Sequence, residues 1–233
     1  MTNNNNLYAS PVQASQALIT HILEAMDQDP ERPFTIALSG GTTPAILFEV
    51  WEREYAAYTP WPRIYFYWVD ERCVPPTDSQ SNFGLANRLL LSKVGISPSH
   101  YYRIIGEGAP EEEARQYSSI VKTTVPTMDC VPVFYFVLLG IGEDGHTSSI
   151  FPDRKDLLTA GEPYCVSVNP YNKTVRICMT GLPMIEARHT CFLVTGENKC
   201  SILKRILDKD KEGIYPASYI WHHARNPQLY ASL

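Results

Sequence analysis

The apolar positions of the chain follow two alternating patterns, which predict helices and strands in turn. The first helix is expected to begin at Ser10, because Pro11 and Gln13 supply a first-turn proline and a capping partner, and apolar residues follow at helical spacing. Asp29 and Pro30 are expected to end it. Short apolar runs predict the strands Phe34–Leu38, Ile64–Val69, Val133–Leu139, Tyr164–Val168, Thr174–Met179 and Cys191–Thr195.

Helical patterns separate these runs. The helices are expected after Pro44, over Asn82–Leu91, from Pro110 onward and across Ile202–Leu207. Strands that alternate with helices predict an α/β fold, a doubly wound (Rossmann-like), mostly parallel sheet with helices on both faces. At this length we expect a single domain over residues 1–233, with residues 1–9 as a flexible tail.

Composition and charge narrow the range of partners. The formal net charge is −5 and no run of lysine or arginine occurs, so we expect no nucleic acid and no membrane as a partner. The polar residues Met1 to Asn6 lack a secretory signal, which predicts a cytoplasmic protein, as a monomer or a small homo-oligomer. Six scattered cysteines without a CxxC pair predict neither a metal site nor a disulfide framework.

The turn after the first predicted strand has the features of an anion site. In open parallel sheets a ligand lies at the carboxyl ends of the strands. Gly40 and Gly41 allow close backbone approach, the hydroxyls of Ser39 and Thr42 add donors, and a helix begins behind them. This pattern is typical of a phosphate-binding turn, although an ordinary tight strand-to-helix turn would have the same residues. No GK[ST] ending follows, which excludes a nucleotide P-loop.

A charged segment follows the second predicted strand. Asp70, Glu71 and Arg72 either face one cleft, where the arginine would suit a phosphate or carboxylate, or form a solvated surface cluster. Two further cations, Arg176 within a strand and Lys199 at a helix start, would be ordinary surface residues in isolation. A lysine in the first turn opposes the helix dipole, which suggests that an anion compensates it.

The segment after Leu138 reads LLGIGEDGHTSSIFP and contains Gly140, Gly142 and Gly145 in a GxGxxG pattern. A dinucleotide site is rejected, because the two acidic residues inside the pattern would repel a pyrophosphate and a proline interrupts the expected helix. Asp144 and His146 remain, two residues apart in a flexible loop, where the carboxylate can orient the imidazole as a general base. A plain surface histidine is the alternative.

Together these segments resemble the 6-phosphogluconolactonase family, within the glucosamine-6-phosphate isomerase/deaminase superfamily. The resemblance spans nearly the whole chain and rests on five ordered motifs: SGGTTP, WVDERCVP with SNFG, LGIGEDGHTSSIFP, the strand arginine and VTGENK. It implies hydrolysis of 6-phospho-D-glucono-1,5-lactone in the oxidative pentose phosphate pathway, without cofactor or metal. It implies His146 as the base, supported by Asp144, and Gly40, Gly41, Thr42, Arg72, Arg176 and Lys199 around the phosphate and the sugar hydroxyls. The segments themselves add Ser39, Asp70 and Gly142 to the expected substrate site.

The resemblance also separates the branches of the superfamily. The deaminases carry a catalytic glutamate five residues after the histidine, where this chain has Phe151, which cannot transfer protons. The alternatives are therefore less favoured: an aminosugar-phosphate isomerase or deaminase that uses Asp70, or a sugar-phosphate sensor without activity. In the expected mechanism a water activated by His146 attacks the lactone carbonyl, and backbone N–H groups around Gly142–Gly145, or a basic side chain, stabilise the oxyanion.

Overall fold

The computed structural model describes residues 5–208 and 213–233. Its centre is a parallel sheet of six strands in the order β1-β11-β10-β7-β2-β3. All five residues of β2 are buried, as expected for a central strand covered on both faces. The strands are β1 Asn5–Leu7, β2 Phe34–Leu38, β3 Ile64–Trp68, β7 Phe136–Leu139, β10 His189–Thr195 and β11 Pro227–Ser232.

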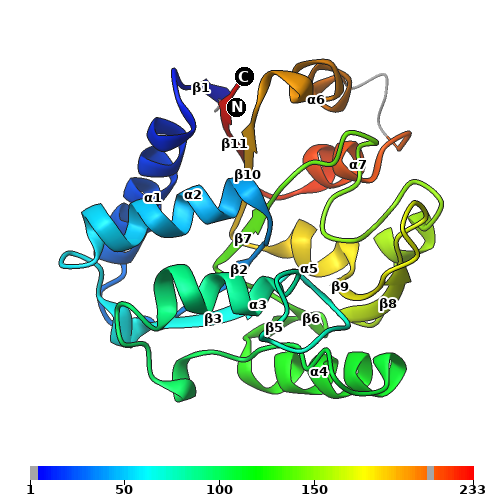
Figure 1. The fold of residues 1–233 in the computed structure, drawn as a ribbon, viewed down its shortest axis with the longest axis horizontal. Coiled ribbons are helices and arrows are strands. Elements are labelled where there is room, and N and C mark those ends of the chain that lie inside the picture. The colour runs from blue at the N-terminus through cyan, green and yellow to red at the C-terminus, as the bar shows by residue number, and fades with distance from the viewer. Residues whose placement is uncertain (1–4, 209–212) are drawn as a thin grey trace.

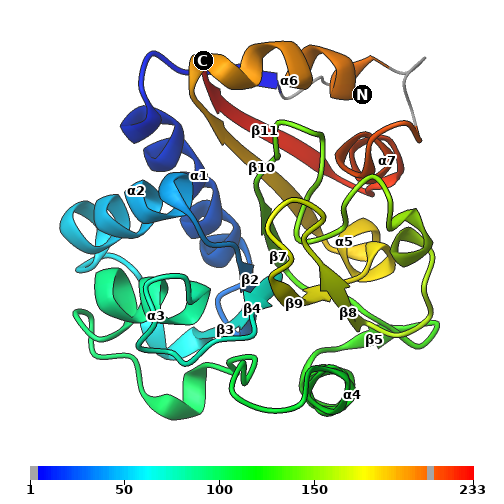
Figure 2. The same ribbon diagram turned by 45° about the vertical axis from the view of Figure 1, so that its right-hand side comes forward.

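Helices cover both faces of this sheet, which confirms the predicted fold class. Figures 1 and 2 show α1, α2 and α3 on one side of the strands and α5 and α7 on the other, while α4 lies at the far end beside the smaller strands. The helices are α1 Pro11–Gln28, α2 Thr42–Val50, α3 Asn82–Ala86, α4 Pro110–Thr124, α5 Gly181–Glu186, α6 Cys200–Leu207 and α7 Pro216–His223. Shorter helical turns span Trp51–Tyr55, Trp61–Arg63, Asn87–Leu91, Pro98–His100, Lys155–Leu158 and Glu197–Lys199.

The start of α1 confirms the capping sequence. The Ser10 hydroxyl accepts the backbone N–H of Gln13 at 3.2 Å, and the Gln13 side chain accepts the N–H of Ala9 at 3.2 Å. These reciprocal bonds satisfy two N–H groups at the helix start. Among the described residues, no helix is long and apolar enough to cross a membrane.

Two predicted strands do not join the main sheet. Tyr164–Val168 (β8) and Val175–Met179 (β9) pair antiparallel with each other, and β9 pairs antiparallel with Asp70–Arg72 (β4). Only residues 169–174 separate β8 from β9, and a parallel connection needs a dozen residues or more. A second short hairpin joins β5 Thr127–Met128 to β6 Val131–Pro132, so the strand predicted from Val133 begins only at Phe136.

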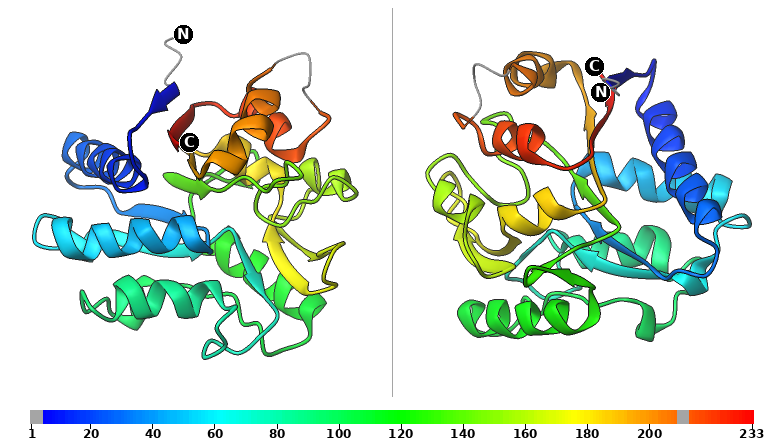
Figure 3. Two further views of the ribbon diagram at one scale, coloured as in Figure 1. Left: turned by 45° about the horizontal axis from the view of Figure 1, so that its top comes forward. Right: turned by 180° about the vertical axis from the view of Figure 1, so that it is seen from behind.

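Both chain ends differ from the prediction. Asn5–Leu7 is an edge strand paired with β11, so this part of the predicted tail is wrong, while residues 1–4 lie outside the described residues. The β11 strand was not predicted, because PQLYAS lacks an apolar run. Figure 3 shows β11 between β1 and β10. The ladders on both sides pair its backbone, and side-chain hydrogen bonds satisfy Gln228 and Tyr230.

The order of the strands creates a cleft at the carboxyl end of the sheet. From β2 the chain moves to β3 on one side, and then returns to β7 on the other side of β2. The loops that leave the carboxyl ends of β2 and β7 therefore run in opposite directions, which is where open α/β sheets bind ligands.

Candidate active site

A cavity of about 260 Å³ opens at the carboxyl end of the parallel sheet. Loops that follow β2, β3, β7 and β10 supply its walls, together with one side chain from β9. The sequence positions involved are up to 160 residues apart, from Ser39 to Lys199. Ten of the eleven predicted site residues line it: Ser39, Gly40, Gly41, Thr42, Asp70, Arg72, Gly142, His146, Arg176 and Lys199.

The turn after β2 brings backbone N–H groups to the cavity. Gly41 has φ 107°, a conformation that side chains disfavour, and it is the N-cap of α2 without any side-chain cap bond. The first N–H groups of α2 and the positive end of its dipole are therefore available to an anion. The predicted hydroxyl donor Ser39 is committed instead, because it donates to the carbonyl of Leu138 at 2.7 Å.

Two arginines lie directly opposite each other beside the turn. Arg72 on β4 pairs in register with Arg176 on β9, and like charges at opposed positions destabilise a strand pair. The Nε atoms of both are buried and lack a hydrogen-bond partner among the described residues. With Lys199 the cavity has three cationic side chains and one carboxylate, Asp70. Its balance of charge favours an anionic ligand.

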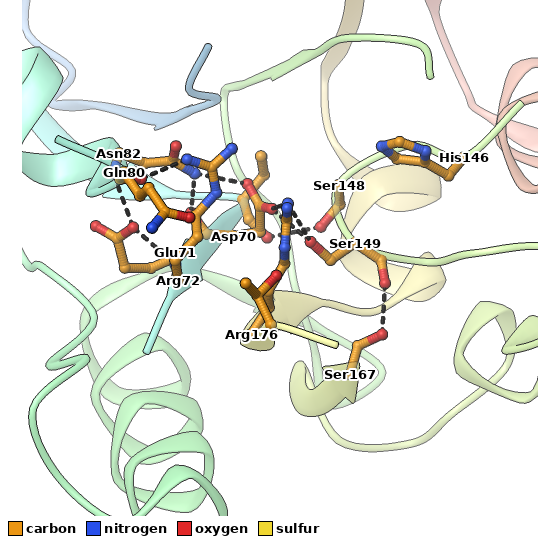
Figure 4. A network of polar contacts seen from close by, with 12 residues as sticks. Asp70, Glu71, Arg72, Gln80, Asn82, His146, Ser148, Ser149, Ser167 and Arg176 are labelled. Carbon is orange, nitrogen blue, oxygen red and sulfur yellow. Dashed lines mark hydrogen bonds and ion pairs between the residues drawn. The ribbon is translucent and has the colours of Figure 1, made fainter. Parts of the chain in front are cut away.

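Asp70 holds Arg176 in place. The Ser149 hydroxyl donates to Asp70 Oδ2 at 2.5 Å, and Arg176 Nη1 lies 3.5 Å from the same oxygen (Figure 4). The Asn82 amide donates to Asp70 Oδ1 at 2.9 Å. Burial lowers the pKa of Arg176, and the charge of Asp70 opposes that shift. Asp70 is thus a fixed counter-charge at the wall of the cavity.

Glu71 does not face this cleft. Alternation along β4 points it away from Asp70 and Arg72, where it accepts the N–H groups of Asn82 and Phe83, each at 2.8 Å. Burial raises its pKa, and these hydrogen bonds oppose the shift. The possibility that both carboxylates face one cleft is therefore wrong, and Glu71 stabilises the start of α3.

His146 and Asp144 form a hydrogen-bonded pair at the cavity. The Nδ1 atom of His146 lies 2.6 Å from Asp144 Oδ1, and the His146 N–H donates to the same oxygen at 3.1 Å. Asp144 does not line the cavity itself, but it fixes the ring that does. Gly142 makes room for the pair, since a Cβ there would lie 2.1 Å from His146 Nδ1. In Figure 4 His146 stands apart from the group around Asp70.

Comparisons with known proteins identify the family of the chain. The family model for glucosamine-6-phosphate isomerases/6-phosphogluconolactonase matches residues 9–230. The chain belongs to this family. It is 39% identical to the 6-phosphogluconolactonase of Treponema pallidum, over 73% of this chain and 71% of that one. It is 35% identical to that of Haemophilus influenzae, over 81% and 80%. The crystal structure of 6-phosphogluconolactonase from Leishmania guyanensis matches with a TM-score of 0.86 at 27% identity, over 100% and 97% of the chains.

A tyrosine that the sequence did not reveal completes the pair in this member of the glucosamine-6-phosphate isomerase/6-phosphogluconolactonase family. The hydroxyl of Tyr171, in the turn between β8 and β9, donates to Asp144 Oδ2 at 2.8 Å. Burial alone would raise the pKa of Asp144, but the bonds and charge of His146 and the bond from Tyr171 lower it well below its usual value. Asp144 is therefore held as a carboxylate.

Phe151 lies between the two parts of the site. Its ring is fully buried, 4.7 Å from the ring of His146 by centroids, and the Arg176 guanidinium carbon lies 5.9 Å from its centroid. The imidazole of His146 therefore lies against an apolar surface in this chain.

Two backbone N–H groups of the loop around Gly142 are not available to an oxyanion, as the sequence had suggested they would be. The N–H of Gly142 donates to the carbonyl of His146 at 2.8 Å, and the N–H of Gly145 donates to the carbonyl of Gly142 at 3.0 Å. Both groups were candidates for an oxyanion site, and both are committed to the loop. Ser148, which also lines the cavity, has φ 52° and donates its hydroxyl to the carbonyl of Val69 at 2.8 Å. Strained backbone of this kind is frequent at functional sites.

No metal cluster is evident at the site. Within the part of the chain that the structure describes, no group of three or more histidine, cysteine, aspartate or glutamate side chains could hold a metal ion. The charged and titratable side chains that line the cavity are the imidazole of His146, the carboxylate of Asp70 and the three cations.

Proposed function

We propose that this chain hydrolyses 6-phospho-D-glucono-1,5-lactone to 6-phospho-D-gluconate, the lactone-opening step of the oxidative pentose phosphate pathway. One observation carries the proposal: the imidazole held by Asp144 at 2.6 Å lines the same cavity as Arg72, Arg176 and Lys199. The curated relatives at 39% and 35% identity, both named 6-phosphogluconolactonase, support the activity.

The phosphate of the lactone binds at the positively charged part of the cavity. The turn from Ser39 to Pro44 offers backbone N–H groups of α2, and Arg72, Arg176 and Lys199 offer charge-assisted hydrogen bonds. Holding this end fixes the ester carbonyl near His146, so that attack by water becomes an oriented reaction.

His146 then acts as the base. Because Nδ1 faces Asp144, Nε2 is the nitrogen that takes a proton from water as the oxygen attacks the carbonyl carbon. The three cations are shared between the phosphate and the resulting oxyanion, whose charge a basic side chain stabilises, since the N–H groups of Gly142 and Gly145 are committed elsewhere. As the tetrahedral intermediate collapses, the carbon–oxygen bond of the ring breaks, and the imidazolium returns its proton to the leaving ring oxygen.

Phe151 argues against an aminosugar-phosphate deaminase. Its buried ring lies where the resemblance places a proton-transferring glutamate in that branch, and a phenyl ring has no ionisable group. Asp70, the other candidate for proton transfer in that branch, is committed to Ser149 and Asn82 and accompanies Arg176.

The deciding experiment is an assay on freshly prepared 6-phosphogluconolactone, coupled to a 6-phosphogluconate dehydrogenase, with spontaneous hydrolysis subtracted. Glucosamine 6-phosphate with ammonia detection is run in parallel. We expect turnover of the lactone and no ammonia; ammonia release without lactone turnover would assign the deaminase activity instead, and no turnover of either would favour a sensor.

A charge reversal tests the phosphate site. Lys199→Glu should raise the Michaelis constant for the lactone by about 10- to 100-fold, because charged hydrogen bonds contribute about 1.5–3 kcal/mol. Lys204→Glu, on the exposed side of α6, is the matched control and should leave it unchanged. An unchanged Michaelis constant in Lys199→Glu would remove Lys199 from the phosphate site.

A further inference from the structure

A second and larger hollow lies at the opposite, amino end of the parallel sheet. Its volume is about 750 Å³, within the range of about 300–1,000 Å³ typical of small-molecule sites. Residues at the starts of β2 and β3 line it, with Tyr135 just before β7 and Arg188 just before β10. The β5–β6 hairpin closes one side through Thr127 and Met128.

The walls are aromatic and carry free hydroxyl groups. Tyr65, Tyr67, Tyr102 and Tyr135 all contribute to the lining, and Tyr67 and Tyr102 stack with their centroids 5.0 Å apart. The Tyr67 hydroxyl donates a hydrogen bond to Thr124 Oγ1 at 3.0 Å. The hydroxyls of the other three have no hydrogen-bond partner among the residues that the structure describes. They are available to polar atoms of a planar ligand.

The charged residues that line the hollow are three arginines, and no aspartate or glutamate of the described chain lines it. Arg32 is paired with Asp29 at 3.0 Å, and Arg225 is paired with Glu186. Arg188 stacks its guanidinium over the Tyr135 ring at 5.2 Å and has no carboxylate partner within residues 5–208 and 213–233. A guanidinium on an aromatic wall is well placed to pair with a phosphate or carboxylate.

We propose that this hollow is a second binding site, separate from the catalytic cavity, for a small aromatic anion: a planar ring system joined to a phosphate or carboxylate group. The ring packs among the tyrosines, and the acidic group pairs with Arg188. The site lies at the other end of the sheet from His146, and neither Arg188 nor the four tyrosines line the catalytic cavity.

The test uses two fluorescent probes with related ring systems. 8-Anilino-1-naphthalenesulfonate carries an anionic group, whereas N-phenyl-1-naphthylamine lacks it. We expect one saturable site for the anionic probe and binding at least about tenfold weaker for the neutral probe, as a charge-assisted pair requires. Arg188→Glu should weaken the anionic probe by about tenfold or more and leave the neutral probe unaffected.

Three further variants locate the bound probe on the molecule. Arg53→Glu makes the same charge change at an exposed residue elsewhere and should leave binding unchanged. Arg176→Glu should also leave it unchanged, because that arginine lines the catalytic cavity. Tyr102→Leu should weaken both probes by removing a ring from the wall. Lactone hydrolysis should be normal in Arg188→Glu.

Several results would overturn the proposal. They are an anionic-probe affinity that Arg188→Glu does not change, loss of binding in Arg176→Glu instead, or the absence of a saturable site. Competition then identifies the source of the anion: displacement of the probe by adenosine monophosphate indicates an aromatic phosphate, and displacement by indole-3-acetate indicates an aromatic carboxylate. Failure of both competitors would likewise overturn it.

Discussion

The two ends of the parallel sheet place histidines in opposite environments. At the carboxyl end, His146 lines a charged cavity and has a carboxylate partner at 2.6 Å. At the amino end, His189 packs against the rings of His21 at 4.8 Å and Phe136 at 4.6 Å, and its Nδ1 lies 3.1 Å from the Asn226 amide. Burial lowers the pKa of His189 to about 4. The imidazole thus faces a charged cavity at one end of the sheet and is kept neutral by burial at the other.

The largest effect should come from removing the imidazole at the carboxyl end. His146→Ala should lower kcat for the lactone by about 10²- to 10⁴-fold, the usual contribution of general acid–base catalysis, and leave the Michaelis constant nearly unchanged. The control is His100→Ala at the amino end, where His100 stacks on Tyr65. Full turnover by His146→Ala, after subtraction of spontaneous hydrolysis, would show that another group is the base.

A smaller loss should follow from displacing the ring without removing it. In Gly142→Ala the new Cβ would meet His146 Nδ1 at 2.1 Å and Asp144 Oδ1 at 2.6 Å, so the pair must shift. A displacement near 1 Å costs about 10²-fold in rate, and we expect kcat to fall by about that factor. Gly161→Ala, where a Cβ meets nothing within 4 Å, is the matched control. Equal activity in both variants would mean that the position of the imidazole is not critical.

Much of the site at the carboxyl end could be predicted from the sequence, because apolar runs, capping residues and glycine-rich turns are local patterns. The bounds of β2 and the cap at Ser10 follow from apolar runs and capping residues. Once the strands are located, the rule that ligands lie at the carboxyl ends of strands brings Gly41, His146 and Lys199 to one cavity although they are far apart in the sequence.

Other features depend on tertiary contacts that no local pattern encodes. The side on which Glu71 falls depends on β4 pairing with β9, which the sequence did not show. Tyr171 reaches Asp144 across 27 residues through a hairpin that was predicted as parallel strands. The short separation of β8 and β9 was the available signal for that hairpin. The tyrosines of the amino end come from separate elements, and each alone has only the pattern of a core residue.

The buried histidine should make stability depend on pH. The unfolded chain protonates His189 below its ordinary pKa of 6.5, but the folded chain does so only near pH 4. Between these values the unfolded state binds more protons, so stability is lost as the pH falls. We expect about 1 kcal/mol less unfolding free energy at pH 5 than at pH 7, allowing for partial solvent screening. Urea denaturation at both pH values measures it.

A matched variant isolates this contribution. His189→Phe keeps an aromatic ring against Phe136 but removes the titrating group, so its unfolding free energy should change less between pH 7 and pH 5. His21, whose pKa burial also lowers, retains part of the dependence. An identical pH dependence in wild type and His189→Phe would show that His189 is not responsible for it.

The smallest effect should come from Tyr171, which acts on the imidazole only through Asp144. Tyr171→Phe removes the hydrogen bond at 2.8 Å, and because the tyrosine is 70% exposed, water replaces part of it. We expect kcat to fall by about 2- to 5-fold, in line with a net hydrogen bond of about 0.5–1 kcal/mol, with no change in the Michaelis constant. The fall in kcat comes from a carboxylate that orients the ring less firmly. The pKa of Asp144 also rises toward its usual value, so its carboxylate stabilises the imidazolium more strongly. The acid limb of the pH profile of kcat/KM should therefore move to higher pH, whereas Tyr58→Phe, at another exposed tyrosine, should leave it in place. A profile unchanged in both variants would mean that Asp144 orients His146 without help from the β8–β9 turn.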